Sequence, residues 1–189
     1  EAVSESRMYD VAAPGRLAEG RTTFPLADDA AVPVDKSYLA RSSFWLGENA
    51  ESQTVPVAVI YKVGAKKLSA ALPAGTVRVY ARDSKGAAQF VGEDRIEHTA
   101  KNEEIALKLG EAFDITAERK QMFFRRVIDK TDKGDRNAGA EVGWRIEIRN
   151  AKDEPVTVRV QENLPGDWEI LGESQKHCRE SARVAAWNV

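Results

Sequence analysis

Apolar and polar side chains alternate at every second residue in several short stretches of this chain, which is the pattern of strands that bury one face. The clearest stretches are Tyr38–Leu46, Val55–Val63, Thr76–Arg82, Trp144–Arg149, Val156–Gln161 and Ala182–Val189. Residues that favour turns separate them, and no stretch has the apolar spacing of an ordinary amphipathic helix. The pattern predicts an all-β protein built as an antiparallel β-sandwich.

Two hairpins are predicted from turn chemistry. Asp83–Gly86 connects Thr76–Arg82 to Ala87–Val91, and Asn150–Glu154 connects the strand at Trp144 to the strand at Val156. Pro56 lies within the stretch Val55–Val63 and cannot donate to a ladder. We therefore expect an edge strand there, or a strand whose first residues lie outside the pairing.

Four other segments complete the expected topology. Arg95–Gly110 is rich in helix formers, but its alternation favours two short strands over a helix. Phe113–Ile128 is expected to form one long strand or two with a bend, Asp129–Gly139 a loop, and Trp168–Leu171 a short strand. We expect two packed sandwich units, residues 1–110 and an immunoglobulin-like unit at residues 111–189.

Composition narrows the classes of partner. The chain has 189 residues, 28 Lys plus Arg against 30 Asp plus Glu, and a net charge of −2, so we expect no nucleic-acid partner. No apolar run approaches the roughly 18 residues that span a bilayer, so no membrane span is expected in this segment. The single cysteine, Cys178, rules out an internal disulfide framework.

Because the chain begins without Met and ends within an expected strand, we interpret it as a fragment of a longer protein.

The segment GEDRIEHT is the best candidate for chemistry. Glu93, Asp94 and His98 supply oxygen and nitrogen ligands for a divalent metal, with Glu97 beside them. The simpler interpretation is that Asp94 makes hydrogen bonds at a bend and the others are solvated. Neighbouring residues of a strand point to opposite faces, so Glu97 and His98 converge only if the strand breaks.

Ligand binding by aromatic and basic residues is the second possibility. Trp45 is expected to be exposed, whereas Trp144, Trp168 and Trp187 fall on inward-facing positions and are expected to pack in the core instead of forming a sugar-stacking platform. Arg125 and Arg126 belong to the strongest basic cluster, which is either a face that is solvated or paired with carboxylates across strands, or a site for anionic glycan or lipid headgroups.

The chain contains none of the common phosphate-loop, dinucleotide, serine-hydrolase or zinc-protease sequence patterns. No cofactor is therefore expected beyond the divalent metal, and catalysis is left open with a preference for a non-enzymatic protein.

The segments LPAGTVRVY, QFVGEDRIEHT, LGEAFDITAERKQ and RNAKDEPVTVRVQENLPGDWEI resemble the bacterial domain of unknown function 4139, found at the C-terminal end of mucoidy-inhibitor-like proteins. VPVDKSYL resembles an earlier strand of the same family. The resemblance implies an all-β protein of the bacterial cell envelope, periplasmic or extracellular, with no established activity. It also implies a further strand after the equivalent of Val189, whose absence leaves an open sheet edge for self-association or another chain.

The sequence thus predicts a structural or interaction module of the envelope whose partner is a protein or a polysaccharide. The alternative is a metal-binding domain or metal-dependent hydrolase centred on GEDRIEHT.

Overall fold

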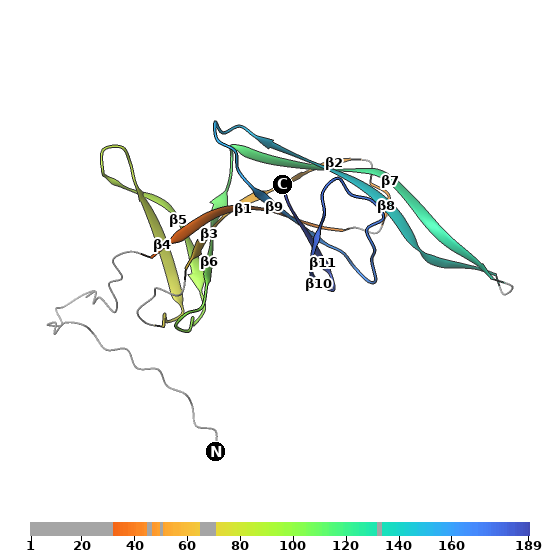
Figure 1. The fold of residues 1–189 in the computed structure, drawn as a ribbon, viewed down its shortest axis with the longest axis horizontal. Helices are drawn as coiled ribbons and strands as arrows, with labels where there is room; N and C mark the ends of the chain where they lie inside the picture. The colour runs from red at the N-terminus through yellow and green to blue at the C-terminus, as the bar shows by residue number, and fades with distance from the viewer. Residues whose placement is uncertain (1–31, 45–46, 50, 65–70, 132–133) are drawn as a thin grey trace, which may run out of the picture.

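The computed structural model describes residues 32–44, 47–49, 51–64, 71–131 and 134–189, and every regular element in these ranges is a strand (Figure 1). The strands are β1 (Val34–Ser43), β2 (Ser52–Val55), β3 (Val57–Val63), β4 (Gly75–Arg82), β5 (Ala88–Ile96), β6 (Ile105–Glu111), β7 (Ile115–Thr131), β8 (Gly134–Asn150), β9 (Val158–Asn163), β10 (Cys178–Ser181) and β11 (Val184–Asn188). The prediction of an all-β, sandwich-like protein is confirmed. The described ranges hold no helix long and apolar enough to cross a membrane.

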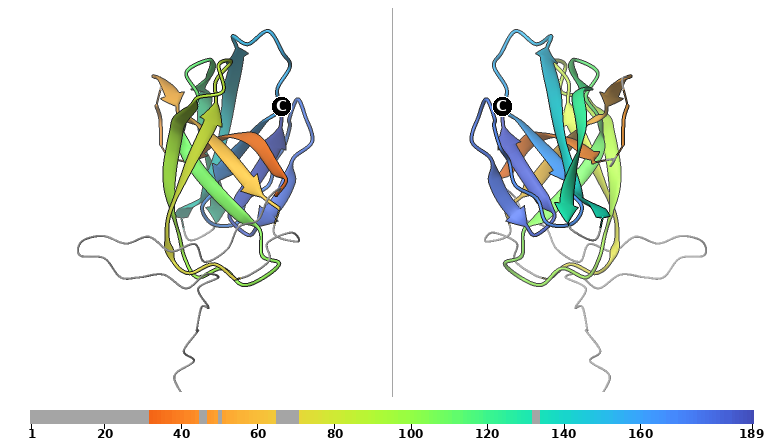
Figure 2. Two further views of the ribbon diagram at one scale, coloured as in Figure 1. Left: turned by 90° about the vertical axis from the view of Figure 1, so that its left-hand side faces the viewer. Right: turned by 90° about the vertical axis from the view of Figure 1, so that its right-hand side faces the viewer.

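The strands form three sheets. A six-stranded sheet has the order β10-β11-β9-β1-β3-β6, a three-stranded sheet has the order β2-β7-β8, and β4 pairs with β5 alone. All pairs are antiparallel except β1 with β9. The end-on views show the sheets as layers (Figure 2). In Figure 1 the β4–β5 hairpin lies at one end of the molecule and the β7–β8 ribbon extends toward the other.

Pro56 marks the point where the chain passes from one sheet to another. β2 ends at Val55 as an edge strand of the three-stranded sheet, and β3 begins at Val57 inside the six-stranded sheet. A residue without an N–H fits such a crossing because neither ladder needs its donor. Of the two alternatives expected for Val55–Val63, the edge strand is wrong, because β3 lies between β1 and β6. The other alternative is confirmed: the first residues lie outside this ladder, which begins after the proline at Val57.

Two hydrophobic cores lie along the six-stranded sheet. The larger core joins its inner face to the three-stranded sheet through buried residues that include Ala40, Ile115, Ala117, Val158 and Val160. The smaller core joins β6 to the β4–β5 hairpin through Ile96, Ile105 and Leu107. Strands from both sides of residue 110 share the large sheet, so the expected division into 1–110 and 111–189 does not separate the sheets. The immunoglobulin-like grouping stays a prediction.

The predicted hairpin of the strands at Trp144 and Val156 is wrong. β8 pairs with β7, whereas β9 pairs with β1 and β11. The connection after Asn150 crosses between the sheets, so the apolar faces of β8 and β9 meet across the core, where Ile146 and Ile148 pack against the cluster that contains Val158. Alternation identifies a half-buried strand but not its neighbour.

The other local predictions have mixed outcomes. The β4–β5 hairpin over Asp83–Gly86 is confirmed, and Arg95–Gly110 contains the end of β5 and most of β6 with no helix. Phe113–Ile128 lies mostly in the single strand β7, whose register shifts between Gln121 and Phe123. The loop expected at Asp129–Gly139 is much shorter, because the β7–β8 ladder continues to the pair Thr131 and Gly134. Trp168–Leu171 forms no strand.

Candidate functional site

The free edge of β8 is the most distinctive feature of the three-stranded sheet. β7 occupies one side of β8, and no strand in the described ranges pairs with its other side. The inner face of β8 carries half-buried Trp144, Ile146 and Ile148, and its outer face carries exposed Arg145, Glu147 and Arg149. An edge with one apolar face is a template for a further strand.

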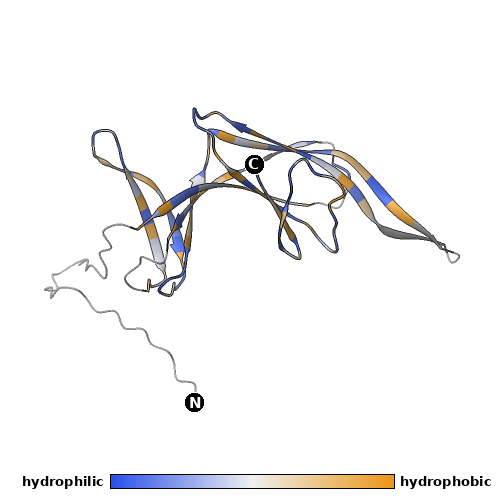
Figure 3. Cartoon of the chain, in the orientation of Figure 1, coloured by the Kyte–Doolittle hydropathy of each residue, from blue (hydrophilic) through white to orange (hydrophobic). Residues whose placement is uncertain are grey.

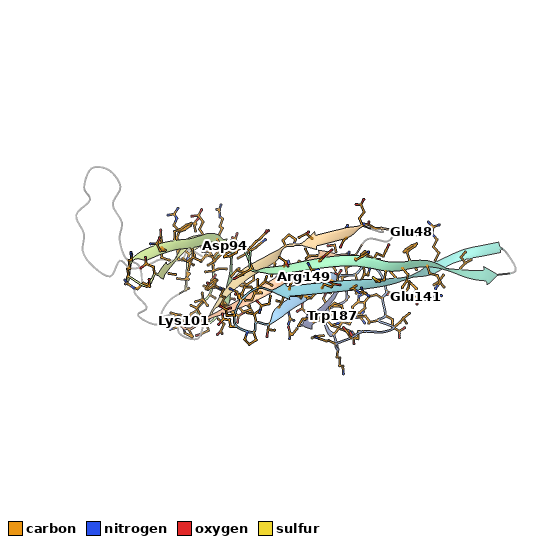
Figure 4. The ribbon with its side chains drawn as sticks, turned by 90° about the horizontal axis from the view of Figure 1, so that it is seen from above. Glu48, Asp94, Lys101, Glu141, Arg149 and Trp187 are labelled. Atoms are coloured by element: carbon orange, nitrogen blue, oxygen red, sulfur yellow. The ribbon has the colours of Figure 1, made fainter. Side chains whose placement is uncertain are left out.

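A large groove adjoins this edge. It has a volume of about 1240 Å³ and is enclosed by β8, by β9 and β11 of the opposite sheet, and by the loop from Leu164 to Gln175. The six-stranded sheet is wider than the sheet that covers it, so the inner face of β11 near Trp187 lacks a covering strand. Figure 4 shows Trp187 on the side of β8 away from β7, whereas Glu48 lies on the β2 side.

Aromatic side chains give the groove its apolar character, and Figure 3 shows apolar residues along the β7–β8 ribbon as well. The aromatic residues that line it are Phe44, Phe123, Phe124, Trp144, Trp168 and Trp187. Its charged lining residues are mostly acidic: Glu141, Glu162, Asp167, Glu169 and Glu173 against Arg126. Glu141 and Glu162 are already paired with Arg125 and Arg119, so the groove combines an apolar interior with negative charge on its loop wall, at Asp167, Glu169 and Glu173.

The loop that forms one wall is fixed by hydrogen bonds from tryptophan and histidine. Trp187 Nε1 donates to Glu173 Oε2 at 2.9 Å, and His177 Nδ1 lies 3.0 Å from the same oxygen. Trp168 Nε1 donates to the carbonyl of Ala182 at 2.8 Å, and the Arg179 guanidinium lies 4.3 Å from the Trp168 ring centroid. Desolvation acts to raise the pKa of Glu173, but the hydrogen bonds from Trp187 and His177 together outweigh it and hold this pKa below its ordinary value of 4.5.

A buried ion pair lies beneath the groove. Arg119 of β7 donates from Nε to Glu162 Oε1 at 2.9 Å and from Nη2 to Oε2 at 3.1 Å, and the two residues are only 2% and 5% exposed. Ser42 also donates to Glu162, and the Arg119 guanidinium lies 3.4 Å from the Trp144 ring centroid. Desolvation raises the pKa of Glu162 above 4.5, although Ser42 and Arg119 act to lower it. The pair connects the two sheets through a polar contact inside an apolar core.

A smaller polar hollow of about 320 Å³ lies on the β2 side of Arg119. Its lining includes Ser43, Glu48 and Gln53. Gln121, itself buried, accepts from the Asn49 amide at 2.6 Å and donates to the Gly47 carbonyl at 2.9 Å. These bonds fix the strand-connecting segment that borders the hollow.

The metal-ligating residues predicted in GEDRIEHT are not brought together. Glu93 pairs with Arg78 at 2.9 Å, Asp94 accepts from the amides of Arg95 and Lys108, and His98 Nδ1 accepts from the Ala74 amide at 3.2 Å. No group of three His, Cys, Asp or Glu side chains in the described ranges has the geometry of a metal site. Figure 4 places Asp94 at the hairpin end, away from Trp187. The bond from Lys108 shows what Asp94 does: it ties β5 to β6.

The other predicted ligand residues are separated as well. Trp45 lies outside the described residues. Arg125 forms an ion pair with Glu141 across the β7–β8 ladder, whereas its neighbour Arg126 lines the groove. Consecutive strand residues face opposite sides, so this basic pair does not form one surface.

The sequence assigned Trp144, Trp168 and Trp187 to the core, and Trp187 does pack against the larger core cluster, but the groove that all three line was not predicted. They are half-buried and line one groove. A lone inward-facing tryptophan in a strand pattern does not show whether the opposite sheet covers it. Its spacing could have placed it on an inner face, but only the width of the opposite sheet decides its exposure.

Comparison of the chain with protein-family models, with curated proteins and with solved structures found no match. The resemblance to domain of unknown function 4139 therefore stays a prediction.

Proposed function

We propose that this chain is a non-enzymatic interaction module that binds an extended segment of a partner protein along the free edge of β8. The observation that carries the proposal is the coincidence of that edge with the aromatic groove. An added strand would satisfy the unpaired backbone groups of β8 and bury alternate side chains against the groove. The open edge and the groove together favour a peptide over a polysaccharide, because a glycan cannot extend a β-ladder.

The charges of the groove indicate the partner's chemistry. Asp167 and Glu169 of the loop wall have no ion pair among the described residues, so a partner segment with Lys or Arg next to this wall would be complementary in charge. The resemblance to an envelope family supports placing the module in the bacterial cell envelope, periplasmic or extracellular. This location belongs to the proposal and rests on the resemblance alone.

A peptide titration tests the proposal. The probe is a synthetic peptide of about ten residues, the upper end of the usual range of strand lengths, in which Val or Ile alternates with Lys or Thr. The control peptide has the same composition with its apolar residues in one block. Three tryptophans line the groove, so binding of the alternating peptide should shift their fluorescence. It should also slow amide hydrogen exchange in Val142–Asn150. The block peptide should do neither.

Two exposed apolar residues provide a matched pair of variants. Leu171 lines the groove and is 72% exposed, whereas Phe113 is 94% exposed and does not line it. Leu171→Ser should weaken binding of the alternating peptide, and Phe113→Ser should leave it unchanged. Equal binding of both peptides, or a fluorescence shift with oligosaccharide but not with peptide, would contradict the proposal.

A further inference from the structure

The outer face of the β7–β8 ladder places like charges opposite each other. Lys120 of β7 is the register partner of Arg145 of β8, and Glu118 is the register partner of Glu147. Like charges directly opposite in an antiparallel pair are destabilising. Arg149 relieves the acidic pair, since its Nη2 lies 3.5 Å from Glu118 and 3.3 Å from Glu147.

The basic pair has no equivalent relief. Among the residues that the structure describes, no carboxylate lies within ion-pair distance of Lys120 or Arg145. Arg145 is exposed and lies on the strand whose other edge is free. A carboxylate placed beside Arg145 from an added strand would balance the two cations.

The outer face of β8 is complementary in charge to itself. Arg145, Glu147 and Arg149 alternate in sign along one face. When two copies of such a strand run antiparallel, the register decides which charges meet. A twofold axis at Arg145 or Glu147 places that residue opposite its own copy, so like charges meet. An axis at Ile146 places Arg145 opposite the partner's Glu147, and an axis at Ile148 places Arg149 opposite the partner's Glu147, so unlike charges meet.

The apolar face chooses between the two favourable registers. An axis at Ile146 places Ile146 opposite its own copy and Trp144 opposite the partner's Ile148, and only at the ends of this row does Val142 face the partner's Asn150. An axis at Ile148 instead places Ile146 opposite the partner's Asn150. The register centred on Ile146 therefore matches charge on the outer face and opposes more apolar side chains on the inner face than the register centred on Ile148 does.

We propose that the β8 edge binds a second copy of this chain, antiparallel and centred on Ile146, so that Arg145 of each copy meets the partner's Glu147. This inference rests on the proposed function and names its partner. The two three-stranded sheets join into one sheet through β8 of each copy. The partner's inner-face residues then extend the apolar row over the groove, and the interface is symmetric, as expected of a twofold dimer.

Exchange of the paired charges tests the register by sedimentation equilibrium at micromolar concentration. The wild type should be dimeric. Arg145→Glu alone and Glu147→Arg alone each oppose like charges at two symmetric positions, so each should weaken dimerisation at least about tenfold. An equimolar mixture of the two variants restores both unlike pairs, so it should form heterodimers. These side chains are exposed, and circular dichroism will confirm that the variants fold.

Arg149→Glu is the control variant. In the register centred on Ile146 this position faces the partner's Gly143, so the variant should stay dimeric. If the axis were at Ile148, Arg149→Glu would face the partner's Glu147 and the variant would be monomeric, which would refute the register centred on Ile146. A monomeric wild type, or single variants that all remain dimeric, would refute dimerisation through β8. If the wild type is monomeric yet binds the alternating peptide, the second copy is rejected and the strand-binding function stands. If it binds no peptide either, both fail.

Discussion

Replacing Arg119 by Met tests whether the buried ion pair is balanced as the structure shows. The variant retains an unbranched side chain against Trp144 but leaves the Glu162 carboxylate with Ser42 as its one remaining hydrogen-bond donor among the described residues. Breaking a buried pair by removing one partner costs about 3 to 5 kcal/mol. The domain's total free energy of unfolding is expected to be about 5 to 15 kcal/mol, so the loss is a large fraction of it.

The pH dependence of this loss identifies its cause. Desolvation already raises the pKa of Glu162 above 4.5 in the wild type, and removing the Arg119 charge raises this pKa further. A carboxyl whose pKa is higher in the folded than in the unfolded state binds an extra proton between the two values, so stability falls as pH rises through that window. The deficit of Arg119→Met should therefore be large at about pH 7 and smaller at about pH 5.

Urea denaturation at the two pH values measures the effect. Arg78→Met is the matched control, because its ion pair with Glu93 at 2.9 Å is exposed and should contribute little. The double variant Arg119→Met with Glu162→Gln removes the uncompensated charge and should recover most of the lost stability. A deficit below about 1 kcal/mol, or one that is equal at both pH values, would refute this account of the pair.

Three further predictions concern the hairpin and the groove wall. A Cβ on Gly92 would lie 2.5 Å from the Leu109 carbonyl oxygen, so Gly92→Ala should lower the midpoint of thermal unfolding. A Cβ on Gly75 would meet open space, so Gly75→Ala should leave the midpoint unchanged. Equal midpoints for the two variants would contradict this packing. Hydrogen bonds from Gln89 and from the amides of Ala87 and Lys85 lower the pKa of Asp83 below 3.8. The ionised Asp83 carboxylate therefore stabilises the fold at pH values above its unfolded-state pKa, and this contribution is lost as the pH falls through its folded-state pKa. An NMR titration that finds the Asp83 pKa at or above 3.8 would reject this stabilising role of the carboxylate. Glu173→Ala removes the acceptor of Trp187 and should shift the tryptophan emission, while Glu169→Ala, which has no hydrogen bond or ion pair in the described structure, should not. Identical spectra would show that the loop is held by other contacts.

Much of the local structure follows from short-range rules. Turn chemistry at Asp83–Gly86 predicted the β4–β5 hairpin, since this Asp accepts from the backbone amides of Lys85 and Ala87. Alternation along Val57–Val63 predicted a strand, and alternation along Trp144–Arg149 predicted a strand with one half-buried and one exposed face. Pro56 predicted a break in pairing. Each of these features depends on residues within a few positions of one another, so the sequence contains the information directly.

The candidate site depends on contacts that the sequence does not encode locally. Arg119 and Glu162 are 43 positions apart, and the register that joins them is set by the packing of two sheets. The same packing turns the expected hairpin of β8 and β9 into two strands that face each other across the core.

By itself, the sequence determined the all-β class, the faces of the main strands and the absence of common catalytic motifs. Only the tertiary structure decided that Glu93, Asp94 and His98 each have separate partners, that β8 has a free edge among the strands described, and that Trp144, Trp168 and Trp187 line one groove. The physical reason is that alternation fixes which side of a strand is apolar, whereas the neighbours of a strand and the cover over its apolar face depend on how distant segments pack.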